Sequence, residues 1–367
     1  MIYLHIPFCK SRCLYCDFFS STSSVLMNAF IDALQKEIEV RVDEIRRARA
    51  NTIYIGGGTP SQMNIAQIKR IFDTIRAVTP IEDGAEITIE CNPDDVTEDF
   101  LSGLLTTPVN RVSMGVQTMD DALLHLLRRR HSAEQARGAV AMLRKAGYHN
   151  LSLDLMYGLP GQSMEMWHKD VDELLSMGVP HLSAYSLQWE EGTPLYKMLE
   201  RGEVAEAPEE LSLEMYRYLV EATFKAGLEH YEISNFAIPG MRARHNSGYW
   251  RNEPYVGLGP GAHSYDGKRR RISNVPDLKA YIHSNGTPMQ EVEDLDDDAI
   301  YEEQVLKGLR TIEGLDLDSV LPKYRDYALD MALPHIESGR LARYGSVLKL
   351  TEDGIFVSND IMSDMML

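Results

Sequence analysis

Six short β-rich runs, each followed by a helical pattern, constrain the fold of this chain more than any other feature. The runs are MIYLHI, NTIYIG, AEITIEC, NRVSMGV, LSLDLMYG and HLSAYSL, at residues 1–6, 51–56, 85–91, 110–116, 151–158 and 181–187. The amphipathic segments between them, with apolar residues at helical spacing, include residues 25–49, 64–78, 132–147 and 163–177. Strands that alternate with helices predict βαβ units, and therefore a parallel sheet with right-handed crossovers.

Polar or glycine residues stand at the carboxyl end of nearly every run. They are the cysteine loop after the first run, Gly56 to Thr59 after the second, and then Glu90, Asn92, Gln117, Asp154 and Gln188. A Rossmann-type sheet concentrates its ligand contacts at one switch point. A β/α barrel instead builds its site on the carboxyl ends of several strands. The pattern therefore favours an α/β fold with an incomplete, TIM-like (β/α)6 barrel.

The alternation stops near residue 200, and the rest of the chain has a different character. Residues 231–265 are rich in Gly, Pro, Asn and aromatic residues, which is typical of an ordered, loop-rich functional segment. From about residue 295 the pattern is helical, and the chain ends in an expected short strand pair and a terminal helix. We expect a barrel over residues 1–200, a loop-rich segment over 201–290 and a small α+β accessory domain over 291–367.

Composition excludes several classes of protein. With 44% hydrophobic and 25% charged residues the chain is ordinary globular material. No stretch approaches the ~18 uninterrupted apolar residues of a membrane span, and no basic segment followed by an apolar one marks a secretory signal. We therefore expect a cytoplasmic protein. The net charge of −18 argues against a nucleic-acid binder, which needs a basic surface for phosphates.

Three of the four cysteines, Cys9, Cys13 and Cys16, form a C-x3-C-x2-C motif. Three such close neighbours cannot all pair with one another, and the cytosol disfavours disulfides, so the motif predicts a metal or cluster site. Three thiolates leave one iron of a four-iron cluster without a protein ligand, and an open coordination position keeps room for a ligand or substrate. Spacing alone leaves a zinc site as the alternative. Cys91 is interpreted as a small buried residue outside this site.

The segment HNSGYW, from His245 to Trp250, is the second informative motif. A histidine beside aromatic residues is usually packed and hydrogen-bonded in a core. Histidine is also a common axial ligand to heme iron, and Tyr249 and Trp250 would offer aromatic faces to a porphyrin. The residues themselves leave both interpretations of His245 open.

The run YLHIPFCKSRCLYCDF followed by IYIGGGTPS resembles the radical S-adenosylmethionine (SAM) superfamily. Within it, the chain is most similar to the branch that contains oxygen-independent coproporphyrinogen III oxidase and its heme-chaperone relatives, over essentially its whole length. The resemblance implies that the three cysteines hold a [4Fe-4S] cluster whose fourth iron is chelated by the amino and carboxylate groups of SAM. It also implies SAM contacts from matching residues, which are Tyr3, Tyr15, Gly57, Gly58, Thr59, Glu90, Gln117, Arg129, Asp154 and, more weakly, Gln188.

Two departures from the decarboxylase pattern favour the heme-chaperone branch. The decarboxylase has a further cysteine two residues after the third ligand, where this chain has Phe18, and a segment ahead of its tyrosine, whereas Tyr3 is the third residue here. The motif H-N-x-x-Y-W also matches the heme-chaperone branch, which implies that His245 is a ligand to heme iron.

The resemblance therefore implies a heme chaperone on a radical SAM scaffold, rather than a coproporphyrinogen dehydrogenase, that passes heme to acceptor hemoproteins. We expect a monomer or weak dimer that contacts membrane-bound acceptors peripherally. The alternatives are a radical SAM oxidase or decarboxylase acting on a porphyrinogen and a zinc-stabilised barrel that binds no cluster.

Overall fold

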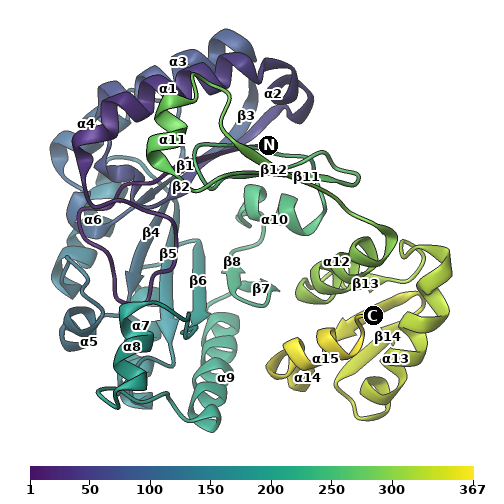
Figure 1. The fold of residues 1–367 in the computed structure, drawn as a ribbon. Helices are drawn as coiled ribbons and strands as arrows, with labels where there is room; N and C mark the ends of the chain where they lie inside the picture. The colour runs from purple at the N-terminus through teal and green to yellow at the C-terminus, as the bar shows by residue number, and fades with distance from the viewer.

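Nine strands form the central sheet of the computed structural model, which describes residues 1–367 (Figure 1). The strand order is β7-β8-β6-β5-β4-β3-β2-β1-β9. The bounds are β1 Ile2–Ile6, β2 Ala50–Gly57, β3 Ile81–Cys91, β4 Arg111–Gln117, β5 Asn150–Tyr157, β6 His181–Ser186, β7 Glu229–Glu232, β8 Asn235–Ala237 and β9 Val256–Leu258. Strands β1 to β6 and β9 are parallel, whereas β8 is antiparallel to β6. No pairing joins β7 to β9, so the predicted barrel-like α/β fold is confirmed as an open one.

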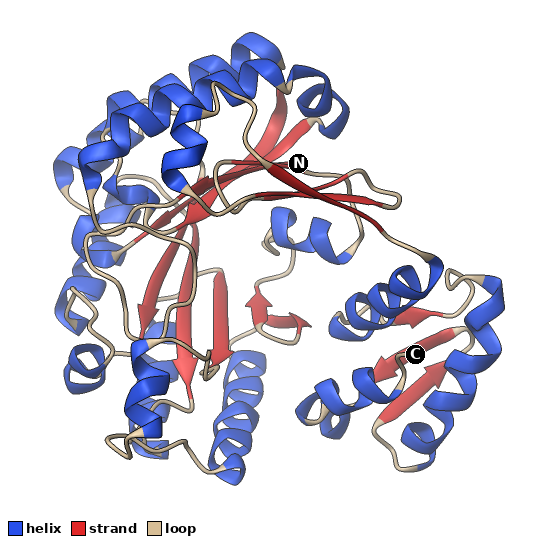
Figure 2. Cartoon of the chain, in the orientation of Figure 1, coloured by secondary structure: helices blue, strands red, loops and turns tan.

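Helices cover the outer face of this sheet (Figure 2). Their bounds are α1 Met27–Val40, α2 Val42–Ala48, α3 Ile65–Val78, α4 Glu98–Leu104, α5 Asp121–Leu126, α6 Ala133–Lys145, α7 Met164–Ser176, α8 Pro194–Glu200 and α9 Glu209–Lys225. Helices α3, α6 and α7 match their predicted ranges to within two residues. Each begins at a capping box, from Asn64, Ser132 and Ser163, that satisfies the first free backbone N–H groups. None of the helices is both long and apolar enough to span a bilayer.

The segment predicted as one helix over residues 25–49 contains two, α1 and α2, which meet at Arg41. The Arg41 guanidinium binds the carboxylate of Glu37 at 3.0 Å and the carbonyl of Gly257 at 2.8 Å. Glu37, which is fully buried, also accepts hydrogen bonds from the Tyr281 hydroxyl and the Gly259 N–H. A buried polar network therefore attaches the glycine-rich loop around Gly259 to the first helix.

The two faces of the sheet differ in chemistry. Along β4, Val112, Met114 and Val116 point outward into the main hydrophobic core. The alternate positions on β4, β5 and β6 line an interior cavity, and they are Arg111, Ser113, Gly115, Gln117, Ser152, Asp154, Met156, Ser183 and Tyr185. Branched apolar side chains fill the interior of a complete TIM barrel. The mostly polar inner wall here leaves space for a ligand instead.

The segment after α9 is more regular than its composition predicted. Strands β7 and β8 extend one edge of the sheet, and β9 pairs with β1 at the other edge. Helix α10, Arg244–Trp250, carries the HNSGYW segment and lies between β8 and β9 in the chain. A second sheet follows, made of β10 His263–Tyr265, β11 Arg270–Asn274 and β12 Gln290–Asp294, with α11 at Leu278–His283.

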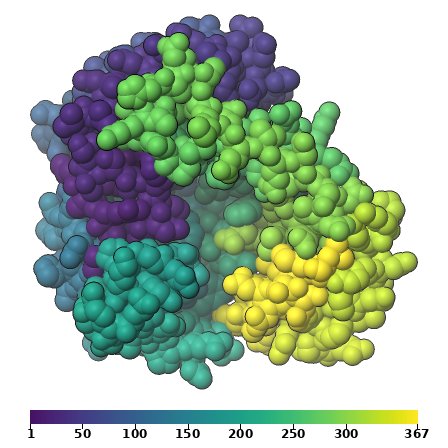
Figure 3. Space-filling model, viewed as in Figure 1, coloured from purple at the N-terminus to yellow at the C-terminus, as the bar shows by residue number.

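Residues 301–365 build a separate hydrophobic core. Its elements are α12 Asp297–Arg310, β13 Leu315–Asp316, α13 Arg325–Glu337, β14 Leu341–Tyr344, β15 Val347–Leu350, α14 Glu352–Phe356 and α15 Ser358–Asp364. Backbone hydrogen bonds from Ile233 to Arg310 and from Ile312 to Tyr231 attach α12 to the β7–β8 edge. Figure 3 shows a deep hollow between this C-terminal domain and the barrel.

Candidate functional site

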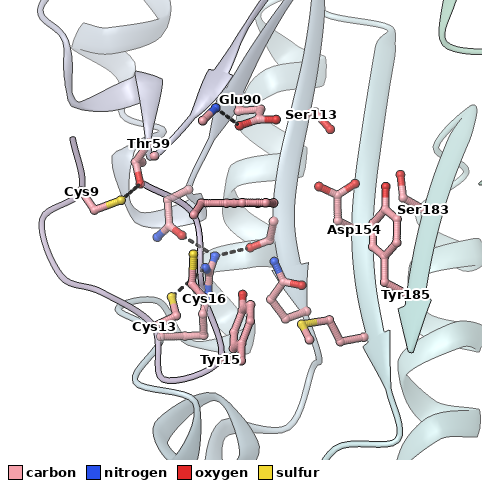
Figure 4. A pocket seen from close by; sticks show the side chains of 18 of the residues that line it. Cys9, Cys13, Tyr15, Cys16, Thr59, Glu90, Ser113, Asp154, Ser183 and Tyr185 are labelled. Atoms are coloured by element: carbon pink, nitrogen blue, oxygen red, sulfur yellow. Dashed lines mark hydrogen bonds between the residues drawn. The ribbon is translucent and has the colours of Figure 1, made fainter. Parts of the chain in front are cut away.

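A cavity of about 590 Å³ lies on the inner face of the sheet, between the cysteine loop and strands β2 to β6 (Figure 4). All but two of the residues expected at the site from the sequence line this cavity. They are Cys9, Cys13, Tyr15, Cys16, Gly57, Gly58, Thr59, Glu90, Gln117, Arg129, Asp154 and Gln188. The two exceptions, Tyr3 and His245, lie behind its wall.

Hydrogen bonds hold the cysteine loop over the carboxyl ends of the strands. The backbone N–H of Cys9 donates to the carbonyl of Ser21, and that of Leu14 donates to Leu127. Two side chains direct donors at the sulfurs, since the Thr59 hydroxyl lies 3.4 Å from the Sγ of Cys9 and Arg129 lies 3.3 Å from the Sγ of Cys13. These two contacts fix the positions of the Cys9 and Cys13 sulfurs at the cavity.

The same three thiols suit a cluster better than a single ion. A zinc ion requires its ligands to converge on one point, with sulfur about 2.3 Å from the metal. No three His, Cys, Asp or Glu side chains of this chain converge in that way. In a four-iron cluster each thiolate binds a different iron, so the sulfurs need not meet. The donor set therefore fits a [4Fe-4S] cluster held by Cys9, Cys13 and Cys16.

At the glycine-rich end of β2, backbone atoms without side chains line the cavity. Gly57 has a φ of 107°, and a Cβ there would lie 2.6 Å from the imidazole of His5. A Cβ on Gly58 would lie 2.7 Å from the carbonyl oxygen of Phe8. Only glycine avoids both the backbone strain and the collisions. The Gly57 N–H donates to the carboxylate of Glu90 at 3.1 Å.

Two carboxyl groups on the inner wall have raised pKa values. Burial raises the pKa of Glu90 to about 7, although the Tyr54 hydroxyl at 2.7 Å and the Gly57 N–H stabilise its charged form. Burial likewise raises the pKa of Asp154 to about 6, against hydrogen bonds from Ser183 and Ser113. Both groups therefore change charge near neutral pH, which is frequent at functional sites.

The other wall residues are fixed by the backbone and by a shared network. Gln117 ends β4 with a φ of 71°, an uncommon conformation for a residue with a side chain, at a break in the β4–β5 register. Arg129 donates to the carbonyl of Gly115 at 2.6 Å and to the side chain of Asn92. These contacts hold the Arg129 guanidinium beside the cysteine loop.

Tyr3 is connected to the cysteine loop through His5. Its hydroxyl lies 3.1 Å from the Nδ1 of His5, and the Nε2 of His5 lies 3.0 Å from the carbonyl of Phe19 at the end of the cysteine loop. This chain of contacts links β1 to the loop from behind the cavity wall.

His245 is buried in α10, and both of its ring nitrogens have hydrogen-bond partners. Nδ1 lies 2.7 Å from the Thr52 hydroxyl, and Nε2 lies 2.9 Å from the Tyr249 hydroxyl. Burial lowers the pKa of His245 to about 3, so the imidazole is neutral. The next residue, Asn246, lines the cavity in its place. The HNSGYW helix therefore forms part of the cavity wall.

Several cavity residues were not singled out in the sequence, notably Arg111, Ser113, Ser183, Tyr185 and Asn246. The sequence could have identified most of them, because polar residues occupy every second position of strands that are otherwise apolar. In a strand these positions share one face. Asn246 carries no such signal, since it belongs to a short helix that reaches the cavity from elsewhere in the chain.

Comparison with known proteins agrees with this geometry. Residues 3–174 match the model of the radical SAM superfamily. The chain is 35% identical to a protein of Bacillus subtilis named heme chaperone HemW, over 98% of this chain and 97% of that one. It is 33% identical to a heme chaperone HemW of Mycobacterium tuberculosis, over 100% and 94% of the two chains. The chain belongs to the HemW family of the radical SAM superfamily.

The fold is shared beyond the HemW family. The solved structure of the Escherichia coli coproporphyrinogen III oxidase HemN, described as a radical SAM enzyme, superposes with a TM-score of 0.84. The match covers 99% of this chain and 89% of that one at 22% sequence identity. The radical SAM family implies a [4Fe-4S] cluster and SAM, and the cavity residues described above suit both groups.

Proposed function

We propose that this HemW-family protein is a heme chaperone that binds heme, a [4Fe-4S] cluster and SAM, and passes heme to acceptor hemoproteins. One observation carries the proposal: the helix with the HNSGYW motif and the loop with the three cysteines are walls of one cavity. The names of the HemW relatives, similar over nearly the whole chain, support it. A cytoplasmic location, a monomer or weak dimer and peripheral contact with membrane-bound acceptors stay predictions.

The chain's own residues would bind and orient SAM. Cys9, Cys13 and Cys16 would hold the cluster, which supplies an electron when reduced. Arg129, close to Cys13, would bind the SAM carboxylate, because a guanidinium fork matches a carboxylate. The carboxylates of Glu90 and Asp154 suit ribose hydroxyls or an ammonium group as acceptors. Gly57 lets the backbone approach the ligand closely.

Heme would bind beside α10, with His245 as a ligand to its iron. The neutral imidazole is the form that binds iron, and the bond from Nδ1 to Thr52 fixes the ring so that Nε2 is the ligating atom. Ligation requires Nε2 to exchange the Tyr249 hydroxyl for iron. Tyr249, which lies against His245, and Trp250 at the end of α10 would have to turn toward the porphyrin as α10 shifts.

The proposal is tested by anaerobic reconstitution followed by heme titration. We expect iron and sulfide near four per chain, as a [4Fe-4S] cluster requires. Heme affinity should fall at least about tenfold in His245→Ala, since a ligand bond is lost. His131→Ala, which removes another buried imidazole from a different part of the barrel, is the matched control. Transfer of heme to an apo-globin is the functional readout. Equal heme binding by His245→Ala and the parent protein would exclude His245 as the ligand.

A radical SAM oxidase or decarboxylase is the second candidate, because the fold is shared with coproporphyrinogen III oxidase over almost the whole chain. Conversion of coproporphyrinogen III by the reduced, SAM-loaded protein would support this candidate over the chaperone. Phe18, which takes the place of a cysteine of that enzyme, is 63% exposed beside the cavity. We therefore expect no conversion.

A further inference from the structure

Arg111 is a buried cation inside the barrel that forms no ion pair. It is the first residue of β4, it is 2% exposed, and it lines the cavity. Its Nε has no hydrogen-bond acceptor, and no carboxylate lies within the 4.0 Å of an ion pair. Arg41, by contrast, is a buried arginine that is paired with Glu37 and Glu44. A buried charge without an ion-pair partner is costly to a fold, so Arg111 is a candidate for binding a ligand.

The position of Arg111 separates it from the cysteine loop. That loop lies at the carboxyl ends of the strands, where Gln117 ends β4. Arg111 stands at the amino end of the same strand, six residues earlier. At about 3.3 Å per residue the two ends of β4 are about 20 Å apart. The cavity therefore has an inner end that is distinct from the cysteine loop.

Polar side chains from neighbouring strands and from α10 line the same cavity as Arg111. Ser113, Ser152 and Ser183 line the cavity from β4, β5 and β6, and Asn246 lines it from α10. All four side chains can donate as well as accept hydrogen bonds. The charges of Asp154 and Glu90 interact with that of Arg111 through space without forming an ion pair.

We propose that the inner end of the cavity binds a carboxylate group, with Arg111 as the residue that recognises it. The guanidinium offers a planar pair of N–H donors that matches the two oxygens of a carboxylate. The neighbouring serines and Asn246 supply further donors.

Charge balance favours a carboxylate over a phosphate. Arg111 contributes a single positive charge, and the nearest charged groups, Asp154 and Glu90, are acids. A carboxylate adds one negative charge beside these acids. A phosphate monoester carries a charge between about −1.5 and −2 near pH 7, so the same acids would repel it more strongly.

Two sources of this carboxylate are consistent with the geometry. One is a propionate of heme, since α10 borders the same cavity, and this source rests on the proposed function. The other is a small organic acid bound next to SAM. The two are separated by comparing heme, heme dimethyl ester and succinate as probes of the cluster-loaded protein.

The experiment uses Arg111→Met, which removes the charge but keeps an unbranched stem, and Arg137→Met as control. Arg137 is a surface arginine paired with Glu173. If heme is the source, the parent protein should bind heme at least about tenfold more tightly than its dimethyl ester, and Arg111→Met should bind both equally weakly. If a small acid is the source, succinate should raise the urea midpoint of the parent protein but not of Arg111→Met, whether or not heme binds.

Stability distinguishes a binding role from a structural one. Without ligand, Arg111→Met should be at least as stable as the parent protein in urea, because an unpaired buried charge is removed. A clearly destabilised Arg111→Met would instead mean that Arg111 supports the fold. The carboxylate site would be overturned if the parent protein bound heme and its dimethyl ester equally well and succinate left its urea midpoint unchanged. An equal rise of the urea midpoint with inorganic phosphate would also overturn it. Failure of heme to bind at all, with the succinate effect intact, refutes the proposed function but not the site.

Discussion

Replacing Glu90 by Gln tests whether its carboxyl group serves ligand binding at the expense of stability. The carboxylate accepts hydrogen bonds from the Tyr54 hydroxyl and the Gly57 N–H. A glutamine can keep both contacts, since its oxygen accepts from Gly57 while its amide donates to the Tyr54 oxygen. The substitution therefore removes the charge and little else.

The magnitude follows from the pKa of Glu90, which burial raises from 4.5 to about 7. The folded state then binds the proton more tightly than the unfolded state, so stability is greatest below pH 4.5 and falls as the pH rises to about 7. At about 1.4 kcal/mol per pKa unit the loss is about 3 kcal/mol. Because the side chain is only half-buried, solvent screening reduces our expectation to about 1–2 kcal/mol.

The assay is urea unfolding of the SAM-free protein at several pH values from 4.5 to 8. Glu90→Gln and the parent protein should be equally stable near pH 4.5, and the variant should be more stable by about 1–2 kcal/mol at pH 8. SAM affinity at pH 8 should fall about tenfold or more, because hydrogen bonds to a charged acceptor are lost. Glu191→Gln, at an exposed position, is the control. A stability difference that does not grow between pH 4.5 and 7 would refute the reasoning.

Three further outcomes follow from the contacts described above. Gly57→Ala should lower iron retention after reconstitution and destabilise the fold by about 1–3 kcal/mol, because of the strained φ and the collision with His5; unchanged iron content would contradict this. Glu37→Ala should lower the free energy of unfolding by about 3–5 kcal/mol, because it leaves Arg41 buried without its partner; a loss below 1 kcal/mol, the range of an exposed pair, would show that the network is solvated. Iodoacetamide should modify the loop cysteines of the cluster-free protein before the buried Cys91, whose pKa burial raises, and peptide mass mapping would detect the opposite order.

The strands and the polar residues at their carboxyl ends could be predicted from the sequence, because both depend on local patterns. The strands are apolar runs at regular spacing, and residues at their carboxyl ends, such as Glu90 and Gln117, meet at one edge of a parallel sheet. Non-local contacts could not be read in this way. Strand β9 has only three residues, and its pairing with β1 depends on a register that nothing near either strand specifies. The hydrogen bonds of His245 come from Thr52 and Tyr249, and only the second is close in sequence.

Helix α10 has a mechanical consequence for the open barrel. Residues 238–255 run from β8, next to one border of the sheet, to β9 at the other border, so they form a strap across the open side of the barrel (Figure 1). Both ends of this strap are fixed by main-chain ladders. We therefore expect a shift of α10 to change the distance between β8 and β9. A ligand that binds at the strap would therefore also change the curvature of the sheet beneath the cysteine loop.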